Sequence, residues 1–238
     1  MPVPLLARQA IAEFLGSAGL VAVVLGSGIA AQRLSPDAGL QLLANALVTG
    51  AGLVALILAF GPVSGGHFNP VITLADRVLG GATNRQVLTY LPAQLAGGVV
   101  GAVLANLMFG LAPVSISGSE RSSGGLWLSE VLATFGLVVL VFALVRSRRV
   151  AVAPFAVGAY ITAAYFWSSS TSFANPMIDV ARTLSDTFAG IAPGSVPMFV
   201  LMQALGGAAA IGVVALLHPE AAERADRVVV PRETTEET

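Results

Sequence analysis

Long apolar stretches alternate with short polar joins along most of the chain. Six of these stretches reach the length of about 20 residues that crosses the hydrocarbon core of a bilayer. They occupy residues 9–31, 41–60, 88–110, 126–145, 150–168 and 197–217. The joins between them are rich in Gly, Pro, Ser, Asp and Asn, which favour turns. The pattern predicts an all-α membrane protein with six transmembrane helices.

Two further apolar stretches, at residues 69–79 and 175–191, are too short to span a bilayer. Each opens with an Asn-Pro pair, which begins at Asn69 in the first stretch and at Asn175 in the second. Asn is a favoured N-cap of a helix, and Pro is favoured at the first helical position. We therefore predict two short half-helices that begin at these pairs.

Polar and glycine residues recur in the same order in both halves of the chain. The order Glu, Gly, Asn-Pro, Gln-x-x-Gly-Gly occurs at Glu13, Gly19, Asn69, Gln94, Gly97 and Gly98, and again at Glu130, Gly136, Asn175, Gln203, Gly206 and Gly207. Each unit holds three spans and one half-helix, so the second unit enters the membrane from the opposite side, as in an inverted repeat. We expect one channel domain over residues 1–217, with repeats at about 9–110 and 126–217, and a cytoplasmic tail over 218–238.

The composition requires a bilayer around this chain. Of its 238 residues 55% are hydrophobic and only 11% are charged, whereas soluble domains carry about 25% charged residues. The net charge of −1 and the lack of a basic patch give no reason to expect a nucleic-acid partner. The absence of cysteine excludes disulfides and thiolate metal sites, and the two histidines are far apart. We predict neither a cofactor nor a metal site.

The arginines predict an orientation. The chain opens with Met1-Pro2-Val3-Pro4, followed by Arg8 and a long apolar stretch that has no clear cleavage site, so this stretch is interpreted as a first span rather than a removed signal peptide. One side of the predicted topology carries Arg8, Arg77, Arg85, Arg146, Arg148 and Arg149 with Arg224, Arg227 and Arg232 of the tail, and the other side carries Arg33, Arg121 and Arg182. Because positive residues favour the cytoplasm, we expect a multi-pass protein of the plasma membrane with both termini cytoplasmic.

The two half-helices predict a pore. Irregular backbone at membrane depth is tolerated only inside protein or along a water-filled cavity. Two half-helices that enter from opposite faces and meet at their N-termini satisfy this condition. The side-chain oxygen of Asn69 or Asn175 would cap its helix, and the amide hydrogens would be donated into the pore. Donors and positive dipole ends at a narrow point disfavour cations.

The segment SGGHFNPVIT, from Ser64 to Thr73, resembles the first signature of the aquaporin and aquaglyceroporin (major intrinsic protein) family. The resemblance extends from Glu13 to about Leu217. It implies a passive channel for water and small uncharged solutes, built as a homotetramer in which each subunit has its own pore. The implied pore motifs are Asn69, Pro70 and Val71, and Asn175, Pro176 and Met177.

The second motif departs from the family pattern. The family usually has Asn-Pro-Ala-Arg there, whereas this chain has Ile178 in the place of the filter arginine, so it resembles an atypical bacterial member. The resemblance implies four selectivity-filter positions, which carry over by their distance from the two asparagines if no insertion intervenes: Thr49, Ala163, Ser172 and Ile178. These side chains are small and uncharged. We expect a wider aperture that admits glycerol-like polyols and neutral metalloid hydroxides such as arsenous acid, because the filter resembles that of bacterial branches thought to carry arsenic species.

Four more polar residues are candidates for the site. Glu13 and Glu130 lie inside spans, where a carboxylate is costly to bury and marks a functional position. They would accept hydrogen bonds from the two re-entrant loops and anchor them, with proton relay as the rival role. His67 is expected to line the cytoplasmic half of the pore, where it would bind solute, respond to pH or only orient its loop. Arg182 would supply a displaced positive charge at the outer vestibule, or pair with a nearby aspartate.

Two alternatives to a passive channel stay open at this point. Secondary transporters are also built from inverted repeats with broken helices, and a membrane interaction protein could keep the fold without conducting. An ion-coupled transporter would need more intramembrane charge than Glu13 and Glu130 provide. We find no arrangement of nucleophile and base, so an enzyme is not expected.

Overall fold

The computed structural model describes residues 3–217 of the chain. Eight α-helices follow one another: α1 Leu5–Leu34, α2 Ala38–Ser64, α3 Pro70–Val78, α4 Asn84–Met108, α5 Gly124–Arg146, α6 Ala153–Trp167, α7 Pro176–Arg182 and α8 Val196–Leu217. Short 3₁₀ turns precede α6 at Val150–Val152 and α8 at Pro193–Ser195. Within the described residues, six helices are long and apolar enough to cross a membrane. The predicted all-α class and its six long helices are confirmed.

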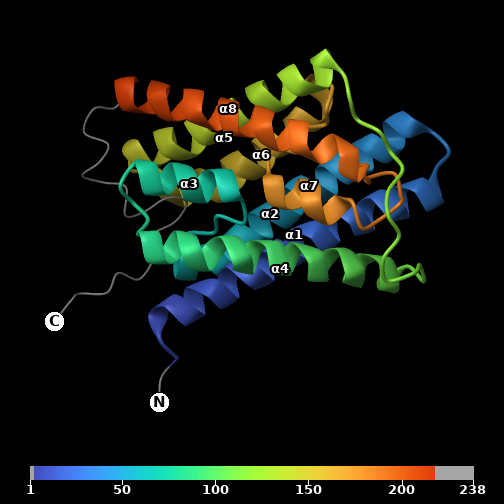
Figure 1. The fold of residues 1–238 in the computed structure, drawn as a ribbon, viewed down its shortest axis with the longest axis horizontal. Coiled ribbons are helices and arrows are strands. Elements are labelled where there is room, and N and C mark those ends of the chain that lie inside the picture. The colour runs from blue at the N-terminus through green and yellow to red at the C-terminus, as the bar shows by residue number, and fades with distance from the viewer. Residues whose placement is uncertain (1–2, 218–238) are drawn as a thin grey trace.

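The helices form two units that interlock. In the first unit α1 packs against α2 and α4, and in the second α5 packs against α6 and α8. The units meet where α2 packs on α6, where α3 contacts α8 and where α7 contacts α4. Figure 1 shows α3 and α7 end to end in the middle of the bundle. The start of α1 and the end of α8 lie at the same end of the bundle (Figure 1).

The second half-helix is shorter than its apolar stretch. The helix α3 fills most of the predicted range 69–79, but α7 ends at Arg182, well before residue 191. Beyond Arg182 the chain turns, with hydrogen bonds from Thr183 N to Val180 O and from Gly190 N to Thr187 O. Ser, Thr, Asp and Gly in this segment favour turns over helix. The tail at 218–238 lies outside the described residues.

Glycines allow the long helices of each unit to cross at close range. A Cβ atom built on Gly97 or Gly101 of α4 would lie 2.2 or 2.3 Å from a backbone oxygen of α1. A Cβ built on Gly206 of α8 would lie 2.3 Å from the Val131 oxygen of α5. No side chain fits at such distances, so the α1–α4 and α5–α8 crossings both depend on small residues.

The third residue of each Asn-Pro motif packs on a glycine of the other unit. A Cβ on Gly207 of α8 would lie 2.6 Å from Cγ1 of Val71, and a Cβ on Gly98 of α4 would lie 2.5 Å from Sδ of Met177. Each half-helix therefore docks through this residue into a recess of the unit to which it does not belong. The large side chain of Met177 is accommodated because Gly98 has none.

Candidate functional site

An internal cavity runs through the middle of the bundle and has one apolar and one polar wall. It encloses about 670 Å³ of empty space, part of which is open to solvent. The apolar wall comes from the long helices α1, α2, α5 and α6 through Leu20, Val24, Leu53, Ile57, Leu137, Val141, Val157 and Ile161. The polar wall comes from the two loops before the half-helices, at Gly66–Asn69 and Ser172–Asn175. A small polar molecule can therefore exchange hydrogen bonds along the two loops and at the hydroxyl groups of Thr49 and Tyr165, and meets an aliphatic surface elsewhere.

The two motif asparagines cap their own helices and bind the opposite loop. Asn69 Oδ1 accepts a hydrogen bond from Val71 N at 2.9 Å, and Asn175 Oδ1 accepts one from Met177 N at 3.1 Å. Their Nδ2 atoms cross over: Asn69 donates to Ala174 O and Asn175 donates to Phe68 O, each at 2.8 Å. An amide nitrogen has two hydrogens, so each asparagine keeps one for the cavity. The prediction that the amide hydrogens are donated into the pore did not include this cross-link.

The residues just before the asparagines hold an unusual backbone conformation. Phe68 and Ala174 both have φ of 46°, in the left-handed region that side chains disfavour. This conformation costs roughly 1–2 kcal/mol per residue. The carbonyl oxygens of these same two residues accept the crossed asparagine bonds. The strain is thus located at the two peptide groups that join the loops at the centre of the cavity.

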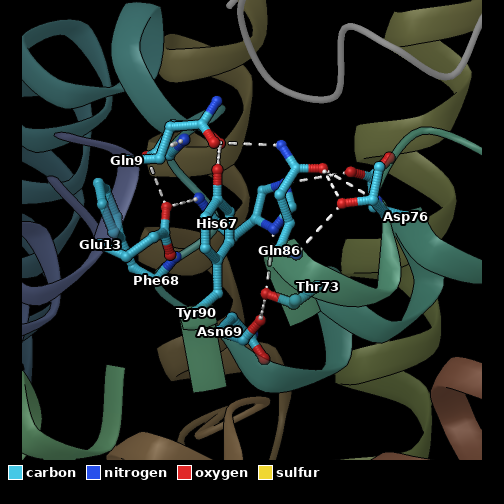
Figure 2. A network of polar contacts seen from close by, with 12 residues as sticks. Gln9, Glu13, His67, Phe68, Asn69, Thr73, Asp76, Gln86 and Tyr90 are labelled. Carbon is cyan, nitrogen blue, oxygen red and sulfur yellow. Dashed lines mark hydrogen bonds and ion pairs between the residues drawn. The ribbon is translucent and has the colours of Figure 1, made fainter. Parts of the chain in front are cut away.

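Glu13 of α1 holds the first loop from behind (Figure 2). Its carboxylate is fully buried and accepts hydrogen bonds from the main-chain N–H groups of His67 at 3.0 Å and Phe68 at 2.8 Å. Ser64 Oγ and Gln94 Nε2 donate to it as well, at 2.6 and 2.7 Å. Four donors around one carboxylate compensate its burial, as a loop-anchoring role requires.

Glu130 of α5 occupies the matching place in the second unit. It accepts hydrogen bonds from the main-chain N–H groups of Phe173 at 3.0 Å and Ala174 at 2.9 Å. Gln203 Nε2 donates to it at 2.6 Å, in the way that Gln94 donates to Glu13. The repeated Glu and Gln residues of the sequence therefore form one structural device, made twice.

His67 borders the cavity with its main chain rather than its ring. The imidazole is fully buried and lies 3.4 Å from Asp76 through Nε2 and 3.0 Å from Thr73 Oγ1 through Nδ1. Figure 2 shows the ring beside the labelled Thr73 and Asp76, and Tyr90 packs edge-on against it. Because the ring has no exposed surface, direct solute binding by the imidazole would need a rearrangement. These contacts favour the loop-orienting role for His67.

Three of the four expected filter residues border the cavity, and one does not. Thr49, Ser172 and Ile178 are lining residues, whereas Ala163 is exposed on the outside of α6. The placement of Ala163 was wrong because a helix turns by about 100° per residue, so a shift of two positions reaches the opposite face. Tyr165 lines the cavity from α6 instead and hydrogen-bonds Thr49 Oγ1 through its hydroxyl at 3.2 Å. Counting back from Asn175 gave the wrong face of α6, because the loop between α6 and Asn175 determines which residues of α6 face the cavity.

Arg182 lies on the cavity wall at the end of α7. It is buried, with 3% of its surface exposed, and its guanidinium stacks on the Phe173 ring at 3.5 Å from the centroid. Its Nε donates to the carbonyl oxygen of Ala189. Among residues 3–217, no carboxylate oxygen lies within 4.0 Å of it, so the expected alternative of an ion pair with Asp179 or Asp186 is not formed.

A second arginine, which the sequence did not single out, stands beside this pair. Arg121, in the loop between α4 and α5, lies 5.1 Å from the centroid of the Phe173 ring and donates through Nε to Gly190 O at 3.1 Å. Burial lowers the pKa of Arg121 from its ordinary value, and the nearby negative charge of Glu130 opposes this shift. No sequence signal marks Arg121, because its loop is distant from both motifs along the chain.

Comparisons with known proteins agree with this architecture. The family model described as major intrinsic protein matches residues 3–189. The chain is 47% identical over 215 residues to aquaglyceroporin AqpS of Rhizobium meliloti (strain 1021), which covers 90% of this chain and 92% of that protein. It is 35% identical over 150 residues to human aquaporin-5, over 60% of this chain and 54% of that one.

A solved structure shows the same fold. The X-ray structure of the aquaglyceroporin from Plasmodium falciparum superposes with a TM-score of 0.71 and covers 91% of this chain and 98% of that chain, at 16% sequence identity. A likeness at this identity concerns the fold alone. Together with the family match over most of the sequence, these findings establish that the chain belongs to the major intrinsic protein family.

Proposed function

We propose that this protein is a passive channel for water and small uncharged solutes. The observation that carries the proposal is the cavity between the two units, which has an aliphatic wall and a polar wall with two asparagine donors at its centre. The aliphatic wall offers no hydrogen bonds and therefore holds solutes weakly, while the donors replace part of their hydration. Conduction requires binding that is favourable enough to enter and weak enough to leave.

The outer part of the cavity is suited to solutes larger than water. Ile178 stands where the family usually has an arginine, and Thr49, Tyr165 and Ser172 share the cavity with it. We infer that glycerol-like polyols pass, and neutral metalloid hydroxides such as arsenous acid are further candidates. The relative described as aquaglyceroporin AqpS supports the polyol part of this proposal.

Two other functions are less well supported by the structure. An ion-coupled transporter needs an ion site at the cavity, but the carboxylates of Glu13 and Glu130 are turned to the loop N–H groups behind it. A non-conducting interaction protein would have no need for an open amphipathic cavity. We propose no catalytic activity, since the family consists of channels.

The assembly and orientation follow from the family and the arginine distribution. We propose a homotetramer in the plasma membrane, with a pore in each subunit and both termini in the cytoplasm. The shared location of the α1 start and the α8 end is consistent with an even number of crossings (Figure 1). Proteolysis of sealed vesicles from either side would test the orientation.

Stopped-flow light scattering on proteoliposomes tests the proposed function. Osmotic shocks with water alone, glycerol and arsenous acid should each relax faster than in empty liposomes, without saturation and without a proton or sodium gradient. Val157→Trp would place an indole in the cavity and should abolish the flux. The matched variant Leu201→Trp, at an exposed position of α8, should conduct normally. Uptake that saturates and depends on an ion gradient would identify a transporter, and no flux at all would favour an interaction protein.

A further inference from the structure

A positive cluster lies at the end of α7, next to the cavity that Arg182 and Phe173 line. Its members are Arg182, Arg121 and the Phe173 ring, with the carbonyl groups of Ala189 and Gly190. Each guanidinium packs on the ring, and the two Nε atoms donate to consecutive carbonyl oxygens of one loop. The cluster therefore joins the loop before α5 to the end of α7 and to the loops on both sides of α7.

The charge of Arg182 is held in place but not neutralised. Among the described residues no carboxylate forms an ion pair with Arg182 or Arg121. The Nη1 and Nη2 atoms of Arg182 donate no hydrogen bond within the described residues. Both atoms retain some accessible surface. Since Arg182 borders the cavity, these free N–H groups are available to whatever occupies it.

The position of Arg182 relates simply to that of Ile178. The two residues are four positions apart on α7, which places them on nearly the same helix face with a rise of about 6 Å between them. The guanidinium of Arg182 can thus border the same cavity as Ile178, one helical turn farther from Asn175. Its guanidinium stacks on the Phe173 ring, which also lines the cavity.

The first unit shows that this arrangement has a counterpart. His67 lies two residues before Asn69 and Asp76 lies seven after it, and the two side chains are 3.4 Å apart. Phe173 and Arg182 hold the same two positions relative to Asn175 and stack at 3.5 Å. In both units a side chain of the loop contacts a side chain near the end of the half-helix. Of these two half-helix residues, Arg182 lines the cavity and Asp76 does not.

We propose that Arg182, braced by Phe173 and supported by Arg121, is the cation barrier and the solute-orienting donor of this channel. It would repel cations at the outer mouth and donate to solutes that carry one strong oxygen acceptor on an otherwise apolar body, because Ile161 and Ile178 line the same cavity with aliphatic side chains. Carboxamides and similar small neutral carbonyl compounds have this chemistry. This inference rests on the proposed channel function.

The test compares Arg182→Gln and Arg182→Lys with the wild type in proteoliposomes. The probes are water, acetamide and glycerol for neutral flux, and protons and sodium for leakage. Arg182→Gln should keep water flux within about twofold, raise cation leakage at least tenfold and lower the acetamide-to-glycerol permeability ratio at least threefold. Arg182→Lys should restore cation exclusion. The control Arg33→Gln changes an exposed arginine on the same side of the membrane and should behave as wild type.

Two further variants keep the inference testable if Arg182→Gln does not assemble. Phe173→Leu retains the charge but removes its support, and should raise cation leakage severalfold. Adding Ile178→Arg to Arg182→Gln returns a guanidinium to the usual family position and should restore exclusion. Unchanged cation leakage in Arg182→Gln, or in Phe173→Leu where that is the variant obtained, overturns the inference. A wild type that passes neither water nor solute would instead overturn the proposed function.

Discussion

Replacing Glu130 by Gln is the sharpest way to test whether the buried carboxylates hold the pore loops. Glu130 accepts three hydrogen bonds, from Phe173 N, Ala174 N and Gln203 Nε2. The amide introduced by Glu130→Gln has one acceptor oxygen in place of two. In its better orientation it keeps the two bonds made by Oε2 and turns its NH₂ group toward Phe173 N, which then loses its acceptor.

The magnitude follows from this single unpaired group and the weaker bonds that remain. A buried N–H without a partner costs about 1–3 kcal/mol, and the two remaining bonds each lose about 1 kcal/mol because their acceptor is no longer charged. Burying a neutral amide is easier than burying a carboxylate, which offsets part of this loss. We expect a net destabilisation of about 1–3 kcal/mol, and a domain of this size loses about 2–4 °C in Tm per kcal/mol.

The assay combines thermal unfolding in detergent with water flux in proteoliposomes. Glu130→Gln should unfold several degrees below the wild type and conduct water more slowly per folded molecule, because Phe173 N loses its acceptor and the bond that holds Ala174 N weakens, so the Ala174 carbonyl that accepts from Asn69 is held less firmly. The matched control is Glu120→Gln, in an exposed part of the loop before α5. If Glu130→Gln and Glu120→Gln have the same Tm and the same flux, the anchoring role of the carboxylate is refuted.

Three other changes test the shape of the cavity and the packing around it. Ile178→Arg should lower glycerol and arsenous acid flux while water flux largely survives in the stopped-flow assay, and equal loss of all fluxes would count against a filter position. Ile161→Phe should narrow the cavity and slow glycerol, whereas Ala163→Phe on the exposed face of the same helix should leave glycerol flux unchanged; the reverse result would restore the original placement of the filter. Gly98→Leu should lower Tm by overpacking Met177, and combining it with Met177→Ala should recover part of the loss, so a strictly additive double variant would argue against this contact.

The sequence predicts the fold well because the bilayer leaves few choices. Apolar stretches of spanning length must become helices in a lipid environment, and all six are present at close to the expected residues. The Asn-Pro pairs give the starts of α3 and α7 correctly, since Asn69 and Asn175 cap these helices through their side-chain oxygens. The end of α7 was harder to predict, because apolar residues continue beyond Arg182 without forming helix.

The site was predictable only where the local sequence determines it. Position 178 follows directly from the cap at Asn175, since both belong to one turn of helix. The face of α6 does not follow, because the loop that connects α6 to Asn175 can place either Ala163 or Tyr165 against the cavity. The partners of Arg182 lie in two other loops, and no pattern along the chain brings Arg121 to the same ring.

Each half-helix packs on a glycine of the other unit, and this has a consequence for how the channel folds during its synthesis. Val71 needs the recess at Gly207, and Gly207 lies on α8, the last of the described helices to be synthesised. The half-helix α3 therefore cannot reach its final packing position until α8 has been synthesised and inserted. We expect each half, expressed alone, to insert its spans without closing a pore, and co-expressed halves to reconstitute one.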